Sequence, residues 1–165
     1  MKTLKYILPV ICILCFWSCK PEKFAPITTD TNVVKQMQGT WALTSVIQVD
    51  EDASTKGFPY KQVNITNVYP YKDLVLTFLG DAQGNPSTFS ITNGNSPKIT
   101  DLTSGNWTVD NAQAPVTITL KNGTAQSQLS FGTYVGLKSG KLNIKKVKMV
   151  NGKAVLSYQY EFTKK

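Results

Sequence analysis

Apolar and polar side chains alternate along most of the chain after residue 38. In the first such run the apolar positions are Trp41, Leu43, Ile47 and Val49. A period of two residues places one set of side chains on one face of a β-strand. Further runs of this kind, separated by turn residues, cover 63–69, 73–79, 88–92, 106–110, 116–120, 128–135, 141–150 and 153–163. Eight or nine short strands with almost no helix predict an all-β, antiparallel sandwich or up-and-down barrel.

A short helix is expected just before the first strand. Asp30, Thr31 and Asn32 are all good N-cap residues, residues 33–38 provide a turn or two of helix, and Gly39 ends it. At the other end of the domain, Asn-Gly at 151–152 joins the last two strand patterns. This dipeptide supplies the two positive φ angles of a type I′ turn, so a β-hairpin is expected there.

The pattern within residues 142–149 is irregular. Its apolar positions change from even to odd numbers across Lys145 and Lys146. A β-bulge at this point would restore the register, so we expect one there. In the last strand, the side chains expected to face inward are Leu156, Tyr158, Tyr160 and Phe162.

The first residues have the pattern of an export signal. Two lysines precede an apolar stretch at 6–17, which is too short for the ~20 residues that span a bilayer. A basic start and a short apolar stretch are typical of a secretory signal. Cys19, directly after a small residue, resembles the lipobox cysteine of bacterial lipoproteins. The alternative is a conventional signal peptide with an incidental cysteine.

The resemblance to a lipobox implies three segments. Residues 1–18 would be a cleaved lipoprotein signal peptide, 19–32 would be the lipidated cysteine and a flexible tether, and 33–165 would be the folded domain. Two or three acyl chains on Cys19 would hold the protein in a membrane effectively for good. The segment 20–23 resembles, weakly, a surface-export signal of Bacteroidota-type lipoproteins. We therefore expect an outer-membrane lipoprotein, with the periplasmic face and the cell surface both left open.

Composition excludes several kinds of chemistry. The chain has 18 Lys and Arg, all of them lysine, against 10 Asp and Glu, a net charge of +8 and no histidine. Without histidine there is no Ser-His-Asp triad and no imidazole ligand, and without arginine there is no bidentate phosphate clamp. Two of the three cysteines lie in the leader, which excludes disulfide scaffolds and cysteine metal sites. We expect no enzyme activity, no cofactor, no metal site and no nucleic-acid binding.

Gly39-Thr40-Trp41, with Leu43 two residues further on, provides a second resemblance. A helical turn followed by Gly-x-Trp at the start of a long strand resembles the lipocalins, in which the Trp plugs the closed end of the barrel. Residues 33–165 resemble the lipocalin-like lipoproteins of unknown function of the Bacteroidota type. The resemblance implies an antiparallel up-and-down barrel of eight to nine strands with a short N-terminal helical turn. It implies structural roles at the barrel end for Gly39 and Trp41.

The chain departs from the lipocalin pattern at one position. Lipocalins usually carry an arginine on the last strand that packs over this Trp, and this chain has no arginine. The candidates for a replacement are Lys153, Lys164 and Lys165.

Two aromatic-proline-aromatic triplets are candidate parts of a ligand site. The connection at 50–62 is long for a hairpin, and in the lipocalin-like arrangement it covers the barrel mouth. The candidate rim residues are Phe58, Tyr60, Tyr69 and Tyr71. Aromatic faces stack on sugar rings or cover apolar ligands. The alternative is that these side chains only close their own loop.

Two charged clusters have competing interpretations. The last third of the chain contains a basic patch of Lys138, Lys141, Lys145, Lys146, Lys148 and Lys153. It could face anionic headgroups or acidic glycans, or it could be the solvated outer wall of a barrel. The acidic run 50–52 lacks the spaced ligands and the glycine of a calcium loop, which favours a solvated turn.

These observations lead to one expected function and one alternative. The first is a lipid-anchored envelope protein whose barrel binds a small apolar or carbohydrate ligand. The alternative is a non-catalytic structural or accessory lipoprotein that acts through its outer surface in an envelope protein complex. An eight-stranded barrel is just wide enough to be filled by side chains. A cavity of ~300 Å³ or more would favour the first function, and a filled interior the second.

Overall fold

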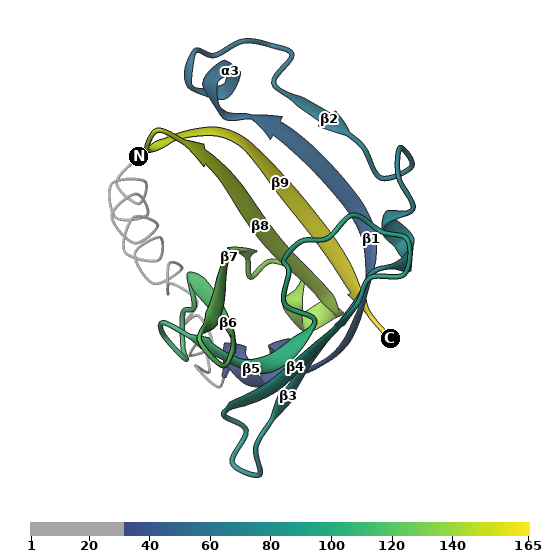
Figure 1. The fold of residues 1–165 in the computed structure, drawn as a ribbon, viewed down its shortest axis with the longest axis vertical. Helices are drawn as coiled ribbons and strands as arrows, with labels where there is room; N and C mark the ends of the chain where they lie inside the picture. Colours follow the sequence, from purple (N-terminus) through teal and green to yellow (C-terminus); the bar gives the residue numbers. More distant parts are fainter. Residues whose placement is uncertain (1–31) are drawn as a thin grey trace, which may run out of the picture. The chain divides into compact units, whose positions relative to one another are not determined.

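Strands make up most of residues 32–165, the part of the chain that this computed structural model describes (Figure 1). The expected signal peptide, Cys19 and nearly all of the expected tether lie outside the described residues. The strands are β1 (Gly39–Asp50), β2 (Gln62–Asn64), β3 (Val75–Gly80), β4 (Pro86–Thr92), β5 (Ser104–Val109), β6 (Thr117–Asn122), β7 (Ala125–Thr133), β8 (Lys141–Val150) and β9 (Lys153–Lys164). The helices are α2 (Val33–Met37) and α3 (Glu51–Thr55), with the 3-10 helices η1 (Tyr71–Asp73) and η2 (Leu137–Ser139).

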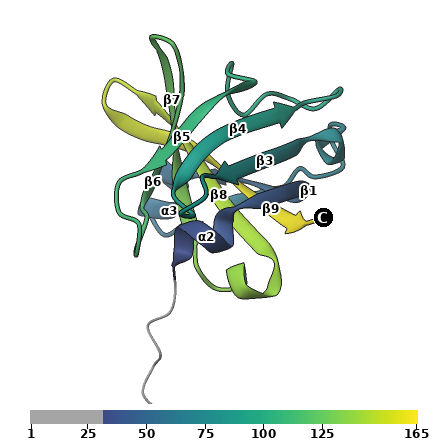
Figure 2. The ribbon, with the colours of Figure 1, turned by 90° about the horizontal axis from the view of Figure 1, so that it is seen from below.

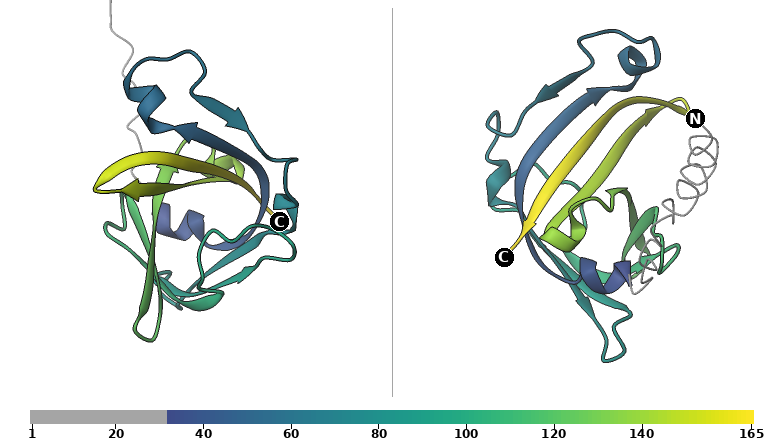
Figure 3. Two further views of the ribbon diagram at one scale, coloured as in Figure 1. Left: turned by 45° about the horizontal axis from the view of Figure 1, so that its top comes forward. Right: turned by 180° about the vertical axis from the view of Figure 1, so that it is seen from behind.

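The strands close into an antiparallel barrel. In the described part of the chain they form one 9-stranded sheet in the order β2-β1-β3-β4-β5-β6-β7-β8-β9, and β1 also pairs with β9. β2 pairs only with β1 and lies outside the ring, so the other strands form an eight-stranded barrel. Figure 3 shows β1, β9 and β8 side by side in the wall. The predicted up-and-down barrel is confirmed.

Helix α2 covers one end of the barrel, which we call the closed end. Its N-cap is Asn32, one of the three N-cap residues that the sequence offered, and the Asn32 Oδ1 accepts a hydrogen bond from the backbone N–H of Lys35. Val33, Val34 and Met37 are buried in the core. Figure 2 shows α2 from below, next to the first residues of β1. The short helix therefore closes the barrel with apolar side chains.

Strand β1 changes faces partway along its length. Its pairing with β9 shifts between Leu43 and Ser45, which leaves Thr44 as an extra residue. After this bulge Val46 is fully buried inside, whereas Ile47 faces outward opposite Gln159. The expectation of one continuous inner face from Trp41 to Val49 is wrong for this reason. The extra residue moves the inward face from odd-numbered to even-numbered positions, and it bends the strand around the barrel.

The bulge expected in β8 at Lys145 and Lys146 is absent from the described structure. Pairing between β8 and β9 is regular from Lys141 to Lys148 and shifts only at Met149, where Val155 on β9 is the extra residue. Lys146 therefore continues the inward face of β8. Beyond it, Val147 is half-buried and Met149 is largely exposed.

The second predicted strand ends early. The sequence predicted strand over 63–69, but β2 stops at Asn64. Beyond it, the hydroxyl oxygen of Thr66 accepts a hydrogen bond from the backbone N–H of Val46 at 2.9 Å. Because this side chain takes the place of a backbone partner, the chain can turn away from β1 there. The predicted hairpin at 151–152 is confirmed, with φ of 49° at Asn151 and 75° at Gly152.

The half of the interior nearest the closed end is filled by side chains. Trp41, Phe78, Trp107 and Phe162 are fully buried there. The rings of Phe78 and Trp107 are 4.6 Å apart between centroids, and the Trp107 Nε1–H donates to the Leu79 carbonyl at 2.7 Å. Side chains thus fill this half of the barrel, and a cavity lies toward the opposite end.

Candidate ligand-binding site

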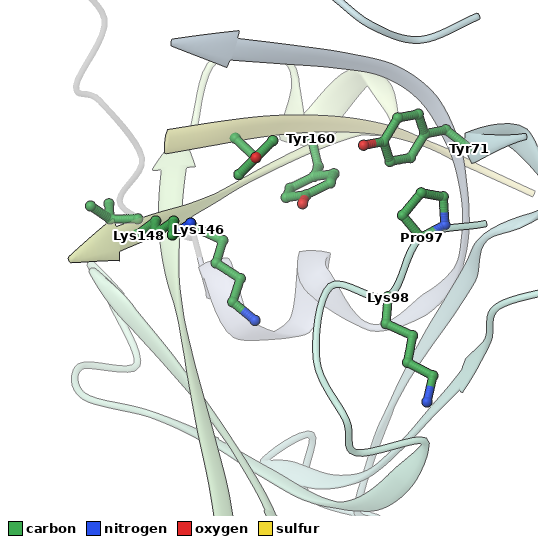
Figure 4. Close-up of a pocket in the computed structure, with 8 residues that line it drawn as sticks. Tyr71, Pro97, Lys98, Lys146, Lys148 and Tyr160 are labelled. Atoms are coloured by element: carbon green, nitrogen blue, oxygen red, sulfur yellow. The ribbon is translucent and has the colours of Figure 1, made fainter. Parts of the chain in front are cut away.

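A cavity of about 490 Å³ lies at the end of the barrel opposite α2 (Figure 4). Its walls include Tyr71, Pro97, Lys98, Lys146, Lys148, Tyr158 and Tyr160. These residues come from η1, from the β4–β5 loop and from strands β8 and β9. The volume exceeds the ~300 Å³ that a small-molecule site requires. The arrangement therefore has the size of a binding site for one small molecule.

Strand register aims four of these side chains into the cavity. Tyr160 pairs with Ile144, Tyr158 with Lys146, and each pair shares one face of the sheet. Lys148 pairs with Leu156 on the same face, two residues beyond Lys146. The Tyr158 and Tyr160 rings are 6.3 Å apart between centroids. The inward orientation that the sequence predicted for these two tyrosines is confirmed.

The opposite wall is held by a buried anchor and by short backbone contacts. Ile99 is fully buried, which fixes the β4–β5 loop and leaves Pro97 and Lys98 at the cavity. The Asp73 Oδ2 accepts a hydrogen bond from the backbone N–H of Asn95 at 3.1 Å, which joins this loop to η1. Tyr71, the first residue of η1, is itself buried. Its hydroxyl and the ring of Tyr160 point into the same space in Figure 4.

Tyr71 and Tyr160 are neutral hydrogen-bond donors in the cavity. Burial raises the pKa of Tyr71 above its ordinary value of 10.0, with smaller contributions from Tyr158 and Tyr69. Burial also raises the pKa of Tyr160 well above its usual range, to which Tyr71 and Tyr158 add. Because the neutral form is favoured, both hydroxyls keep their protons at physiological pH.

Lys146 connects the two walls. Its ammonium group donates a hydrogen bond to the carbonyl oxygen of Ile99. The side chain is partly buried, and an ammonium group has three N–H donors. The contact therefore holds the loop against β8 and leaves further donors facing the cavity.

The structure separates the four predicted rim residues. Tyr71 lines the cavity. The ring of Tyr69 packs edge to face against the ring of Tyr71, with 5.9 Å between the centroids. Tyr69 also lines a separate, shallow hollow formed by 66–72. Tyr60 is 95% exposed beside a third hollow, and Phe58 is 54% exposed. Tyr71 and Tyr69 are thus brought together, whereas Tyr60 and Phe58 lie elsewhere.

The six lysines of the predicted basic patch do not share one face. Lys146 and Lys148 line the cavity, and Lys138 lies in η2, which contacts α2 at the closed end. The other three have acidic partners: Lys141 with Glu161 at 3.4 Å, Lys145 with Glu51 at 2.8 Å, and Lys153 with Asp52 at 2.9 Å. Whether any of them contacts an anionic surface stays a prediction.

The acidic run after β1 caps and fastens helix α3. Asp50 is the N-cap, and its Oδ1 accepts from the backbone N–H of Ala53 at 2.9 Å. Glu51 accepts from Ser157 on β9 at 2.5 Å. Within residues 32–165 there is no group of three or more Cys, His, Asp or Glu that could hold a metal ion. These carboxylates have structural partners instead.

Sequence reasoning missed Lys146 and Lys98 as cavity residues. For Lys146, the sequence did contain a signal. Leu142, Ile144 and Lys146 follow one another at a spacing of two residues, which places Lys146 on the inner face. We interpreted the lysine as a break in that pattern because a charged side chain is rarely buried. Lys98 reaches the cavity through a loop, and a loop has no periodicity from which its direction could be predicted.

Comparison with known proteins adds a family but no activity. A family model described as "Domain of unknown function (DUF5004)" matches residues 19–163. No curated protein matches the chain. Over residues 32–165, no helix is long and apolar enough to cross a membrane.

Proposed function

Because the chain belongs to the family described as a domain of unknown function (DUF5004), we propose a function from the geometry of its own barrel. The protein is a lipid-anchored envelope lipoprotein whose lipocalin-like barrel binds one small ligand. The observation that carries this proposal is the cavity of about 490 Å³ between η1, the β4–β5 loop, β8 and β9. A barrel of eight strands leaves room for one small ligand when its side chains do not fill it.

The lipocalin-like part of the proposal is supported by the closed end. Gly39 and Trp41 begin β1 there, and the Trp41 Nε1–H donates to the Met37 carbonyl of α2 at 2.7 Å. Lys164, on the last strand, places its ammonium 5.3 Å from the centroid of the Trp41 ring. This is the position at which lipocalins usually carry an arginine. Of the three lysines that the sequence offered as a replacement for that arginine, Lys164 is the one that lies over Trp41.

The anchor rests on Cys19 and on the leader that precedes it. The family match starts at this cysteine, where the mature chain is proposed to start. Acyl chains on Cys19 then bind the outer membrane, and the barrel lies at the periplasmic face or at the cell surface. Asn32, the first described residue, precedes α2 at the closed end. The folded domain is thus joined to its tether at the end away from the cavity.

The ligand is a small molecule with an apolar body or a sugar ring. Tyr71, Tyr158 and Tyr160 present aromatic surface to the cavity, which gives contact area at low cost in side-chain entropy. Their hydroxyls add hydrogen-bond donors for ring substituents. No step of catalysis is proposed, since the cavity walls contain no carboxylate or thiol among the residues that line them.

Native mass spectrometry of protein purified from the envelope tests the proposal. We expect acyl chains on Cys19 and a retained small molecule of defined mass. Tyr71→Ala should lower the amount of retained small molecule roughly tenfold, because the loss of about 1.4 kcal/mol of binding free energy weakens affinity by that factor. Tyr60→Ala is the matched comparison, because Tyr60 lies outside the cavity. A chain without acyl groups, or equal retention by the wild type and Tyr71→Ala, would contradict the proposal.

A second function is favoured by the exposed apolar side chains between β1 and β3. Phe58, Tyr60, Val63, Val68 and Tyr69 are all more than half exposed. A cluster of exposed apolar side chains favours contact with a partner protein. The protein would then act as an accessory subunit through its outer surface. Cross-linking in intact cells that depends on Tyr60 and Val68, with no retained ligand, would support this second function.

A further inference from the structure

Several lysines on the outside of the barrel pair with a carboxylate, whereas the lysines at the cavity do not pair with one in the described part of the chain. On the outside, Lys141, Lys145 and Lys153 each lie within 4.0 Å of a carboxylate. At the cavity, Lys98, Lys146 and Lys148 have no carboxylate within that distance among the described residues. The same strand, β8, carries both kinds. On this strand the difference follows the face of the sheet.

Lys146 is the most informative of the cavity lysines. It is partly buried, and the partner of its ammonium in the described structure is the neutral carbonyl of Ile99. Removing a charge from water is costly unless an opposite charge or several hydrogen bonds compensate it. An anion in the cavity would supply that compensation, and the two remaining N–H donors of the ammonium are available to it.

The tyrosines add to the excess of donors. No hydrogen bond joins the hydroxyl of Tyr71, Tyr158 or Tyr160 to another described residue, whereas Tyr134, outside the cavity, donates to the Pro115 carbonyl at 2.7 Å. None of the residues that line the cavity is acidic. The walls thus offer ammonium groups and O–H donors on aromatic faces, and their chemical complement is an acceptor with negative charge on a ring or apolar body.

We propose that the ligand of this cavity is a small organic acid whose carboxylate lies between Lys146 and Lys98 and whose body lies on Tyr71, Tyr158 and Tyr160. Figure 4 shows Lys146 and Lys98 on either side of the space into which Tyr160 points. This inference rests on the proposed ligand-binding function and specifies the ligand's chemistry. The carboxylate can belong to an acidic sugar or to a fatty acid, and the experiment separates these two sources.

Calorimetric titration of the full-length purified protein tests the proposal with two matched probe pairs. The first pair is galacturonic acid and its methyl ester, and the second is octanoate and octanol. We expect the acid of one pair to bind at least tenfold more tightly than its neutral counterpart. That ratio corresponds to about 1.4 kcal/mol of binding free energy, close to the least that a hydrogen bond to a charged group contributes. The pair that shows it identifies the source of the carboxylate.

Three variants connect the selectivity to Lys146. Lys146→Gln should weaken binding of the acid about tenfold and leave binding of the neutral probe unchanged. Lys146→Arg keeps the charge and should retain most of the affinity. Lys141→Gln removes a lysine from the outer face of the same strand, so its affinity should equal that of the wild type. Thermal unfolding of each variant shows whether the barrel remains folded.

The outcomes distinguish this inference from the proposed function. If acid and neutral probes bind equally, or if Lys146→Gln binds the acid as the wild type does, the inference is wrong and the cavity binds neutral ligands. If no acid binds, the inference is also wrong. In that case the mass of any molecule retained by the native protein decides whether the cavity is a binding site at all.

Discussion

The ammonium group of Lys164 lies 5.3 Å from the centroid of the Trp41 ring. Trp41 is fully buried at the start of β1, and Lys164 is the last residue of β9, so the contact joins the first and last strands of the ring. Their pairing is direct, because Trp41 lies opposite Lys164 in the β1–β9 ladder. A cation over an aromatic face contributes about 0.5–1 kcal/mol at an exposed site.

Replacing Lys164 by Met should therefore lower the free energy of unfolding by about 0.5–1 kcal/mol. Lys164→Arg should keep the stability of the wild type, since a guanidinium stacks on the same ring. Urea unfolding followed by tryptophan fluorescence measures both. Lys165→Met is the control for loss of a lysine at the C-terminus. If Lys164→Met and Lys165→Met lose equal stability, the contact with Trp41 contributes nothing.

Gly39 should be sensitive to substitution because Lys164 crosses it. Its φ is 129°, and a Cβ there would lie 2.7 Å from the Cε of Lys164. Gly39→Ala adds backbone strain of roughly 1–3 kcal/mol and displaces the lysine from Trp41. Combined with Lys164→Met, the same substitution should cost less, because the contact is already lost. If the losses in free energy of unfolding are additive in this double-mutant cycle, Gly39 and the Lys164–Trp41 contact act independently.

Thr66 replaces a missing strand partner, so its hydroxyl should matter more than its size. Thr66→Val leaves the backbone N–H of Val46 without the acceptor that it has at 2.9 Å. An unsatisfied buried donor costs about 1–3 kcal/mol. Thr66→Ser keeps the oxygen and should cost much less. Chemical denaturation compares the two, and a Thr66→Val protein as stable as Thr66→Ser would show that water satisfies Val46 instead.

Alternation along the sequence predicted an antiparallel sandwich or barrel, and the resemblance to the lipocalins favoured the barrel. Cap and turn residues predicted the short helix and the Asn151-Gly152 hairpin. These features depend on periodicity and on turn chemistry, which are local. The positions of the bulges in β1 and β9 could not be predicted from the sequence. An extra residue such as Thr44 carries no apolar signal, and the choice of strand on which it falls depends on closure of the whole ring.

The site was less accessible to sequence reasoning than the fold. Tyr71 was proposed because of its aromatic-proline-aromatic triplet, and it lines the cavity. Tyr60 was proposed from the same pattern and is almost fully exposed outside it. The two triplets look alike in sequence, but only the second ends in a 3-10 turn, in which its last residue, Tyr71, is buried. Which triplet faces the cavity depends on the tertiary path of the connection between β1 and β3.

Glu51 should make stability depend on pH in the acidic range. Lys145, and then Ser157, lower the pKa of Glu51 from its ordinary value of 4.5. The folded state favours the ionised carboxylate of Glu51. Its contribution to the free energy of unfolding is therefore complete above pH 4.5 and is lost as the pH falls below that value. Glu51→Gln should be less stable than the wild type at pH 7 by up to about 1 kcal/mol, since the pair is partly solvated.

The difference between Glu51→Gln and the wild type should shrink as the pH is lowered below 4.5. Thermal unfolding at a series of pH values measures it. Glu161→Gln is the control, because its partner Lys141 is 3.4 Å away and exposed, so its removal should have little effect. A difference that stays constant down to acidic pH would show that Glu51 acts through packing and not through its charge.

Tyr160 and Tyr134 should show opposite effects when each loses its hydroxyl. The Tyr160 hydroxyl has no hydrogen bond to another described residue, so Tyr160→Phe should change the free energy of unfolding by less than about 0.5 kcal/mol. If the hydroxyl donates to the ligand, retention should fall roughly fivefold, as expected for one neutral hydrogen bond. Tyr134→Phe removes a bond to the Pro115 carbonyl at 2.7 Å and should cost about 1 kcal/mol without affecting retention. Unfolding curves and native mass spectrometry of the two variants measure these quantities. If Tyr160→Phe loses stability and retains its ligand, the hydroxyl serves the fold, and the cavity surface around it is not a binding surface.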